Sequence, residues 1–231
     1  MQISKDIEPI QCALYWTTEK ILIINDLHIG YEEALQKRGF LVPKFQTQEI
    51  IKKAQSILKE VKPKIIILNG DIKHTFGKIL QQEWKDIRKL LTYLQQHGKV
   101  IIIKGNHDPI IQPIVKDMDI AIVKEYKVKD TLIIHGDKLV KTNAKRLIIG
   151  HEHPAITVRE NSKYEKYKCY LKGKWQRKEL IVMPSFNPLI EGTDILKEQV
   201  LSPFLKNLKN FEVFILSKKE VFEFGKVKNL N

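Results

Sequence analysis

Short apolar runs alternate with amphipathic segments through the first half of the chain. The runs at 21–24, 65–68 and 100–103 have the length and continuous apolar character of strands buried in a parallel sheet. Between them, segments 50–61 and 80–94 repeat apolar residues at the spacing of a helix that covers a core with one face. The order strand, helix, strand, helix, strand predicts βαβ units, which form a parallel sheet with right-handed crossovers.

Beyond residue 120 the pattern becomes predominantly extended. Apolar runs that predict further strands stand at 120–123, 131–135, 146–149, 155–159, 166–172 and 178–183. Near the end of the chain, 213–216 and 221–224 flank Ser-Lys-Lys-Glu and predict a hairpin. Segment 194–210 has mixed helical character broken by Pro203 and supports no single assignment. The whole pattern indicates an α/β sandwich with parallel and antiparallel strands.

Composition places the chain among globular proteins. Of its 231 residues, 43% are hydrophobic and 29% are charged, and no repeat, low-complexity segment or Gly/Ser linker divides it, so we expect a single domain across 1–231. No apolar stretch reaches the roughly 18 residues of a membrane span, and the first residues lack the apolar core of a signal peptide. We therefore expect a cytoplasmic protein with no membrane partner.

The two cysteines place a limit on metal chemistry. Cys12 and Cys169 stand far apart without CxxC spacing, so they form either one disulfide or, as is usual in the cytoplasm, a reduced pair. Because the chain has no cysteine cluster, we expect any metal to be held by His, Asp and Asn.

The chain is strongly basic, with 40 Lys and Arg against 27 Asp and Glu and a formal charge of +13. Such an excess suits a polyanionic partner such as nucleic acid, but it is equally typical of residue usage in a thermophile. The densest basic segment is 163–178, which predicts a hairpin turning near Gly173. By period two, one of its faces carries Lys166, Lys168, Tyr170 and Lys172. This face either binds single-stranded nucleic acid through lysine contacts and tyrosine stacking or is the solvated face of an outer strand.

The most informative feature is a set of polar motifs that terminate five of the apolar runs. Each motif carries side chains that are able to bind metal: Asn25-Asp26-Leu27-His28, Asn69-Gly70-Asp71, Gly105-Asn106-His107-Asp108, His135-Gly136-Asp137 and Gly150-His151-Glu152-His153. Since ligands bind at the carboxyl ends of strands in open α/β sheets, these ends are able to converge on one site. One such motif alone is more often a capped turn, but five in succession favour a functional site.

The number of these side chains fits two metal ions. Seven ligands are available, and one bridging carboxylate would give each metal four: Asp26, His28, Asp71, Asn106, His135, His151 and His153. Nitrogen and oxygen donors without thiolate suit Mn²⁺ first, with Fe, Zn²⁺ or Ni²⁺ as alternatives.

The succession Asp-x-His, Gly-Asp, Gly-Asn-His-Asp, His-Gly and Gly-His-x-His resembles the calcineurin-like metallophosphoesterase superfamily. The phrases GDIKHTFG, GHEHPA and SFNPLIEGTD are similar to those of the archaeal SbcD-related and DNA-ligase-associated phosphoesterases. The resemblance implies a sandwich of two β-sheets flanked by helices. It also implies two divalent metal ions that share a hydroxide, which attacks a phosphate ester.

The resemblance also implies a role for each residue. It assigns Asp26, His28 and His153 to one metal, Asn106, His135 and His151 to the other, and Asp71 to both. His107 is implied as the general acid or the group that orients the phosphate, and Asp108 as the residue that holds the His107 imidazole. His74 is either a contact of the substrate phosphate or of a ligand carboxylate, or a surface residue at a helix start.

Two features depart from the family pattern. Many members have Thr or Ser between the last two histidines, where this chain has Glu152, whose side chain we expect to point away from the metals. The repair nucleases of the family carry a capping domain for DNA, and this chain has little room for one, which argues against duplex processing.

The expected function is hydrolysis of phosphodiesters in nucleic acid or nucleotides, by a monomer or a homo-oligomer. A phosphomonoesterase or a cyclic-nucleotide phosphodiesterase would use the same chemistry. A scaffold without catalysis, such as the retromer subunit of this fold, lacks the catalytic His, whereas this chain has both His107 and the full ligand set.

Overall fold

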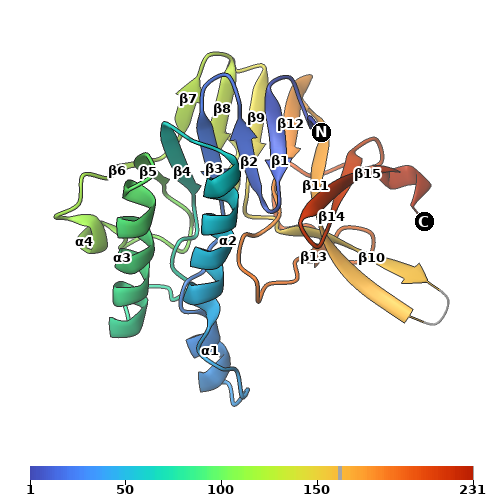
Figure 1. Cartoon of the computed structure of the whole chain (residues 1–231). Helices are drawn as coiled ribbons and strands as arrows, with labels where there is room; N and C mark the ends of the chain where they lie inside the picture. Colours follow the sequence, from blue (N-terminus) through green and yellow to red (C-terminus); the bar gives the residue numbers. More distant parts are fainter. Residues whose placement is uncertain (161–162, 231) are drawn as a thin grey trace.

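The computed structural model describes residues 1–160 and 163–230, which form two β-sheets with helices packed against one of them (Figure 1). The helices are α1 (Tyr31–Lys37), α2 (Gln46–Glu60), α3 (Gln81–Gln95), α4 (Gln112–Val115) and a final 3-10 turn (Val227–Asn229). Among the described residues, none of the helices has the length and apolar character needed to cross a membrane.

The first sheet has the order β1-β2-β3-β4-β5-β6. Its strands are β1 (Ile7–Ile10), β2 (Ala13–Trp16), β3 (Ile21–Ile24), β4 (Ile65–Asn69), β5 (Lys99–Ile103) and β6 (Ala121–Val123). Strands β3 to β6 are parallel, while β1 and β2 form an antiparallel extension at one edge. The parallel part is the one that the βαβ pattern predicts.

The second sheet has the order β13-β10-β11-β12-β9-β8-β7, and β14 and β15 branch from β11. Its strands are β7 (Tyr126–Val128), β8 (Thr131–Ile134), β9 (Arg146–Ile149), β10 (Pro154–Glu160), β11 (Lys163–Trp175), β12 (Lys178–Val182), β13 (Thr193–Asp194), β14 (Glu212–Ser217) and β15 (Glu220–Lys226). Strands β8, β9 and β12 are parallel neighbours, and most of the other pairs are antiparallel. The mixed α/β sandwich that the sequence predicts is therefore confirmed.

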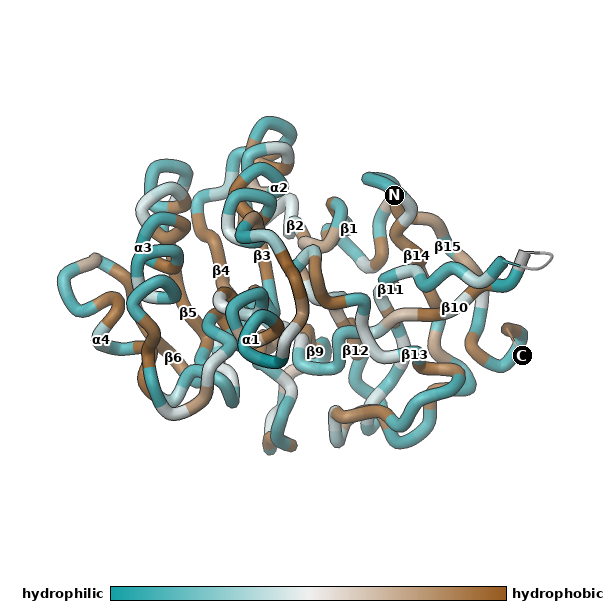
Figure 2. Tube along the Cα trace, turned by 90° about the horizontal axis from the view of Figure 1, so that it is seen from below, coloured by the Kyte–Doolittle hydropathy of each residue, from teal (hydrophilic) through white to brown (hydrophobic). Residues whose placement is uncertain are grey.

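Alternating side chains divide the core into layers. In β3, Leu22 and Ile24 pack under α2 and α3, whereas Ile23 faces the second sheet, because successive side chains of a strand point to opposite faces. Seen from below, helices α2 and α3, the first sheet and the second sheet follow one another across the view, with apolar residues along the strands (Figure 2). Segment 194–210, unassigned from the sequence, begins with the last residue of β13, forms no long element and packs Phe204 against the outer face of the second sheet.

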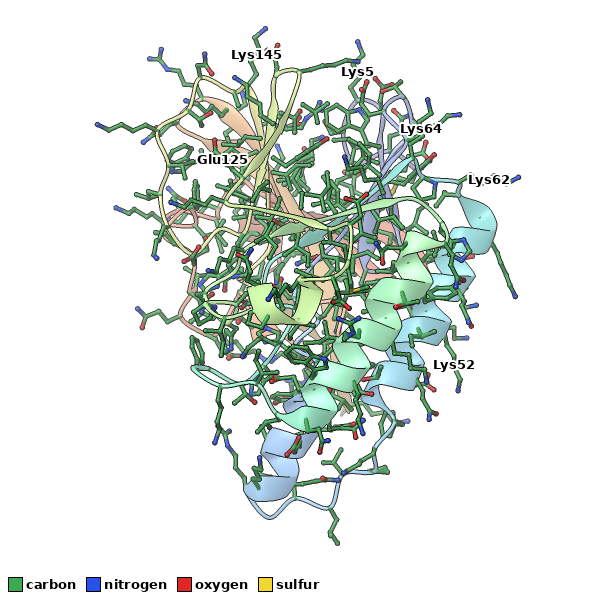
Figure 3. The ribbon with its side chains drawn as sticks, turned by 90° about the vertical axis from the view of Figure 1, so that its left-hand side faces the viewer. Lys5, Lys52, Lys62, Lys64, Glu125 and Lys145 are labelled. Atoms are coloured by element: carbon green, nitrogen blue, oxygen red, sulfur yellow. The ribbon has the colours of Figure 1, made fainter. Side chains whose placement is uncertain are left out.

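The strands that carry the polar motifs end at the same end of the molecule. Lys64 and Lys145 directly precede β4 and β9 and lie at the upper end in Figure 3, so these strands run downward. Helix α1, shortly after β3, lies at the lower end (Figure 1). The carboxyl ends of strands from both sheets therefore meet at the lower end.

The basic hairpin differs from the prediction. β11 runs through Gly173 without turning, and the turn to β12 is formed by Gln176 and Arg177, both with positive φ. Position 173 requires glycine because a side-chain carbon there would overlap the ring of Phe211. Strands β10 and β11 extend together away from the helices as a two-stranded arm (Figure 1).

Candidate functional site

The polar residues at the ends of β3, β4, β5, β8 and β9 come together where the two sheets meet. Two groups have ligand atoms that lie within 4.8 Å of one another, namely Asp26, His28 and His153, and Asp71, His135 and His151. The family resemblance implies a similar division, with Asn106 in the second set and Asp71 in both. A third group of three histidines, His28, His74 and His107, shares His28 with the first.

In the first group the donor atoms face each other directly. The Nε2 atoms of His28 and His153 are 3.3 Å apart, and His153 Nε2 is 3.4 Å from Asp26 Oδ1. Donors about 2.1 Å from a shared metal in tetrahedral geometry are about 3.4 Å from each other. The spacing in this group therefore fits a bound ion.

Asp71 connects the two groups. Its Oδ2 lies 3.6 Å from His28 Nε2 and 3.3 Å from His135 Nε2. Asn106 joins the second group through its Oδ1, which is 2.9 Å from His135 Nε2. One carboxylate oxygen thus faces donors of both groups, as a ligand shared by two metals must.

The site is deeply buried on one side and open on the other. Asp26, His28, Asp71 and His135 are at most 3% exposed. Asn106, His107, His151 and His153 are only half-buried. A substrate therefore reaches the site from the side of these four residues.

The buried histidines differ sharply in pKa in the absence of metal. Burial and the charge of His153 lower the pKa of His28 to about 3, against the attraction of Asp71 and Asp26. Burial also opposes protonation of His135, but its hydrogen bond and charge interactions with Asp71 and Asp26 prevail and raise its pKa to about 9. A metal ligand must be deprotonated, so metal binding would release the His135 proton at neutral pH.

The backbone at the ligands is strained. Five of the seven predicted ligands have φ between +42° and +65°, which is the left-handed region: Asp26, His28, Asp71, His151 and His153. A residue other than glycine costs about 1–3 kcal/mol in such a region, and these conformations concentrate at functional sites. The strain turns these side chains into the space between the sheets.

Two glycines of the polar motifs are required because other residues approach their Cα atoms closely. A side-chain carbon at Gly70 would overlap the imidazole of His135, and one at Gly105 would collide with the backbone and carboxylate of Asp71. Both glycines therefore make room for a ligand.

His107 lies beside the two groups. Its Nε2 is 4.0 Å from Asp71 Oδ2, its backbone N–H donates to Asp71 Oδ1 at 2.9 Å, and its Nδ1 is 2.7 Å from the carbonyl oxygen of His74. The contact with His74 fixes the ring and leaves Nε2 directed at the site.

The role implied for Asp108 is wrong. Its carboxylate is fully buried and accepts hydrogen bonds from the backbone N–H groups of Ile72, Lys73 and Gly105. Burial and the charge of Asp71 raise the pKa of Asp108 to about 6, although these N–H groups oppose the shift. Asp108 therefore fixes the loops that carry Asp71 and Asn106, and it is the His74 carbonyl that holds His107.

His74 is part of the site and not a surface residue at a helix start. Its ring is half-buried, 5.5 Å from the rings of His28 and His107 and 4.9 Å from that of Tyr31. Phe76, which is 56% exposed, covers His107 at a centroid distance of 3.8 Å. Sequence reasoning missed Tyr31 and Phe76, although Phe76 lies in the phrase GDIKHTFG.

Three polar side chains that sequence reasoning missed hold the loop after β3. Ser185 Oγ donates to the Asp26 carbonyl at 2.8 Å, Asn187 Nδ2 donates to the Leu27 carbonyl at 3.0 Å, and Gln46 Nε2 donates to the His28 carbonyl at 2.7 Å. The Ser-Phe-Asn-Pro phrase was the available signal. Its role is to support the first ligand group from behind.

Glu152 points away from the ligands, as expected. Its carboxylate is buried and accepts hydrogen bonds from the backbone N–H groups of Leu201 at 2.8 Å and Ser202 at 2.7 Å. Burial raises its pKa despite these bonds. The departure from the family pattern therefore anchors the segment after β13.

The structure contradicts the nucleic-acid contacts predicted for Lys168 and Tyr170. Tyr170 is fully buried between the sheets, and its hydroxyl donates to the carbonyl oxygens of Gln11 and Ala13, both at 2.8 Å. Lys168 Nζ donates to the carbonyl oxygens of Ser185, at 2.9 Å, and Asn187. Tyr170 is thus closed to solvent, and the half-buried Lys168 already directs its amine to two carbonyl oxygens of the chain.

Lys166 and Lys172 are also committed to internal partners. Lys166 Nζ lies 3.0 Å from Glu198, and Lys172 Nζ lies 3.4 Å from Glu212. Their charges are paired with carboxylates at the surface, and their contact with a nucleic-acid strand stays a prediction.

Comparison with known proteins agrees with this geometry. The family model of calcineurin-like phosphoesterases matches residues 19–209. Nuclease MPE of Pseudomonas putida is 19% identical, with a TM-score of 0.66 over 93% of this chain and 92% of its own. The E. coli phosphoesterase YfcE is 13% identical, with a TM-score of 0.45 over 91% of this chain and 99% of its own. No curated protein matches the sequence. The extent of the family match shows that the chain belongs to the calcineurin-like phosphoesterase family.

Proposed function

We propose that the protein is a metal-dependent phosphodiesterase that acts on nucleic acid or nucleotides. The observation that carries the proposal is the pair of metal-capable groups joined by Asp71, each with one carboxylate and two histidines. Such a pair at the carboxyl ends of adjoining strands is suited to two ions that act on one phosphate.

In this proposal Asp26, His28 and His153 hold one metal, and Asn106, His135 and His151 hold the other. Asp71, whose Oδ2 faces both His28 and His135, would contribute to both. When bound, two such ions activate water and neutralise charge on the phosphate oxygens. The absence of thiolate among the donors favours Mn²⁺, with Fe, Zn²⁺ or Ni²⁺ as alternatives.

His107 is proposed to donate a proton to the leaving oxygen. Its Nδ1 lies 2.7 Å from the His74 carbonyl, which keeps a proton on that nitrogen, so Nε2 is the atom that exchanges a proton with the substrate. That Nε2 atom lies 4.0 Å from Asp71 Oδ2 and so faces the ligand groups. Because His107 is half-buried at the open side, substrate reaches it without rearrangement of the core.

Three features support a nucleic-acid substrate. The chain carries a formal charge of +13, its motif phrases are similar to those of SbcD-related and DNA-ligase-associated phosphoesterases, and a nuclease shares its fold. The exposed Phe76 beside His107 offers an aromatic face to a base on the leaving group.

The test is an assay of metal-stripped protein reconstituted with each of the four metals. Substrates are bis(p-nitrophenyl) phosphate, p-nitrophenyl phosphate and a labelled single-stranded oligonucleotide. We expect turnover of the diester and the oligonucleotide with Mn²⁺ and none after chelation. Faster turnover of the monoester would contradict the diesterase proposal, and no turnover with any metal would contradict an enzymatic role.

A further inference from the structure

A cleft of about 580 Å³ opens from the site at Asn106 and His135. It is formed by the loops after β5, β6 and β8, and its wall carries Lys104, Lys124 and Lys138. The cleft therefore begins at the second ligand group and leads away from it between the two sheets' loops. A phosphate alone does not need this volume, which lies within the roughly 300–1,000 Å³ of sites that enclose much larger ligands.

The lysines of this cleft differ from those of β11 in what they contact. All three are exposed, and within the described chain neither Lys104 nor Lys124 lies within ion-pair distance of a carboxylate. Lys104 Nζ donates only to the carbonyl oxygen of Pro109, at 2.9 Å, and Lys138 lies 3.7 Å from Asp137. The amines of Lys104 and Lys124 therefore remain able to bind an external anion, and Lys138 adds a cation whose carboxylate contact is long.

The cleft also offers apolar contacts, and its charge balance is positive. Ile134, Leu139 and Val140 line it, and Leu139 is 51% exposed. Three lysines against the carboxylates of Glu125 and Asp137 leave an excess of one positive charge. Separated cations with apolar surface between them match a chain of phosphates joined by sugars better than a single compact anion.

We propose that this cleft, with Lys104, Lys124 and Lys138, binds the phosphates of a single nucleic-acid strand on one side of the scissile phosphate. The inference rests on the proposed phosphodiesterase function and specifies that the substrate extends beyond the reacting ester. It also moves the nucleic-acid contact from β11, where the sequence suggested it, to the loops after β5, β6 and β8.

The test compares two triple variants with the same loss of charge. The first replaces Lys104, Lys124 and Lys138 with Gln. The control replaces Lys5, Lys62 and Lys64 with Gln, which are exposed at the end of the molecule opposite the site and project outward in Figure 3. Binding of a fluorescein-labelled oligothymidylate of about 12 nucleotides is measured by anisotropy in EDTA over a range of salt concentrations.

The cleft variant should bind the oligonucleotide at least about tenfold more weakly than wild type. Its log–log salt slope should flatten by about two, since each phosphate neutralised on a single strand contributes about 0.7. The control should keep the wild-type slope. Equal weakening by the two triple variants, or no oligonucleotide binding by wild type, would overturn the inference.

Turnover separates this inference from the proposed function. With Mn²⁺, the cleft variant should keep the wild-type kcat/KM for bis(p-nitrophenyl) phosphate, which carries no flanking phosphates for these lysines to bind, and lose about tenfold on the oligonucleotide. If the cleft variant turns over both the small diester and the oligonucleotide at wild-type rates, the cleft is not the strand-binding site. The proposed phosphodiesterase function would then still stand. Equal losses on both substrates would show that the lysines act on the site and not on an extended strand.

Discussion

Two parts of the molecule concentrate polar residues, the loops after the parallel strands and strand β11, and they use them differently. Most of the buried side-chain atoms without a hydrogen-bond partner in the described chain lie at or near the ligand loops, among them atoms of Asn25, His28, Asn69 and His74. None of them belongs to β11. The polar side chains of β11 instead form ion pairs or hydrogen bonds within the chain, namely Lys166, Lys168, Tyr170 and Lys172.

The difference shows which polar residues are available to a ligand. A buried polar group without a partner is costly, so such groups concentrate where something outside the chain completes them. On β11 the same residue types stabilise the fold. Substitutions in both regions test this distinction, beginning with the bridging carboxylate, where we expect the largest effect.

Replacing Asp71 with Asn should abolish hydrolysis and lower the content of both metals, because one oxygen of Asp71 faces both ligand groups. The amide oxygen is still able to accept the His107 backbone N–H, now 2.9 Å from Oδ1, so the fold should be retained. Metal content is measured by plasma mass spectrometry after desalting. Asp130→Asn, at an exposed surface carboxylate, is the matched control. Loss of only one metal from Asp71→Asn would show that Asp71 does not bridge.

Replacing His107 with Ala should leave both metals in place and lower kcat by about 10²–10⁴-fold. If Nε2 protonates the leaving oxygen, the loss should be greater for a nucleoside leaving group than for p-nitrophenolate, which leaves without a proton. His97→Ala, at an exposed histidine after α3, is the control. Loss of metal from the His107 variant would instead make His107 a ligand, in keeping with its place in the group with His28 and His74.

The convergence of the seven predicted ligand side chains was predictable because each follows an apolar strand within a few residues. Isoleucine runs identify β3, β4 and β5, parallel strands end at a common edge, and the motifs begin where the runs end. The roles of Asp108 and His74 were not predictable, because both depend on loop conformations that bring residues about thirty positions apart into contact. The positive φ values of the ligands likewise depend on contacts between the two sheets.

Strand β11 shows the limit of periodicity. A spacing of two correctly groups Lys168 and Tyr170 on one face, but it does not indicate whether another element covers that face. The covering groups are the carbonyls of Gln11 and Ala13, more than 150 positions away along the chain. β1, which contains Glu8 and Pro9 within its four residues, and β2, which contains Ala13, were not predicted.

Lys168 provides a test of burial through pH. Burial and the nearby charge of Lys53 lower its pKa to about 8, below the 10.5 of an unfolded lysine. Between these values the unfolded chain binds the additional proton, so this residue makes the free energy of unfolding rise with pH, by up to about 3 kcal/mol. The free energy of unfolding of Lys168→Met, measured by denaturant unfolding from pH 8 to 10.5, should therefore rise less with pH than that of wild type. If the free energies of unfolding of wild type and Lys168→Met differ by the same amount at every pH in this range, the pKa of Lys168 is not lowered by the fold.

The smallest effect is expected for Lys166 and Lys172. Each is paired with a carboxylate at the surface, Glu198 and Glu212, and such pairs contribute about 0–1 kcal/mol. Replacing both with Ser should therefore change the free energy of unfolding by less than about 1 kcal/mol per pair. The salt slope of oligonucleotide binding should match that of the Lys5, Lys62 and Lys64 control, because neither side chain contacts the strand. A slope flattened by about 0.7 for each lysine would show instead that the pairs open for phosphate. In that case β11, and not the cleft after β5, β6 and β8, would carry the strand.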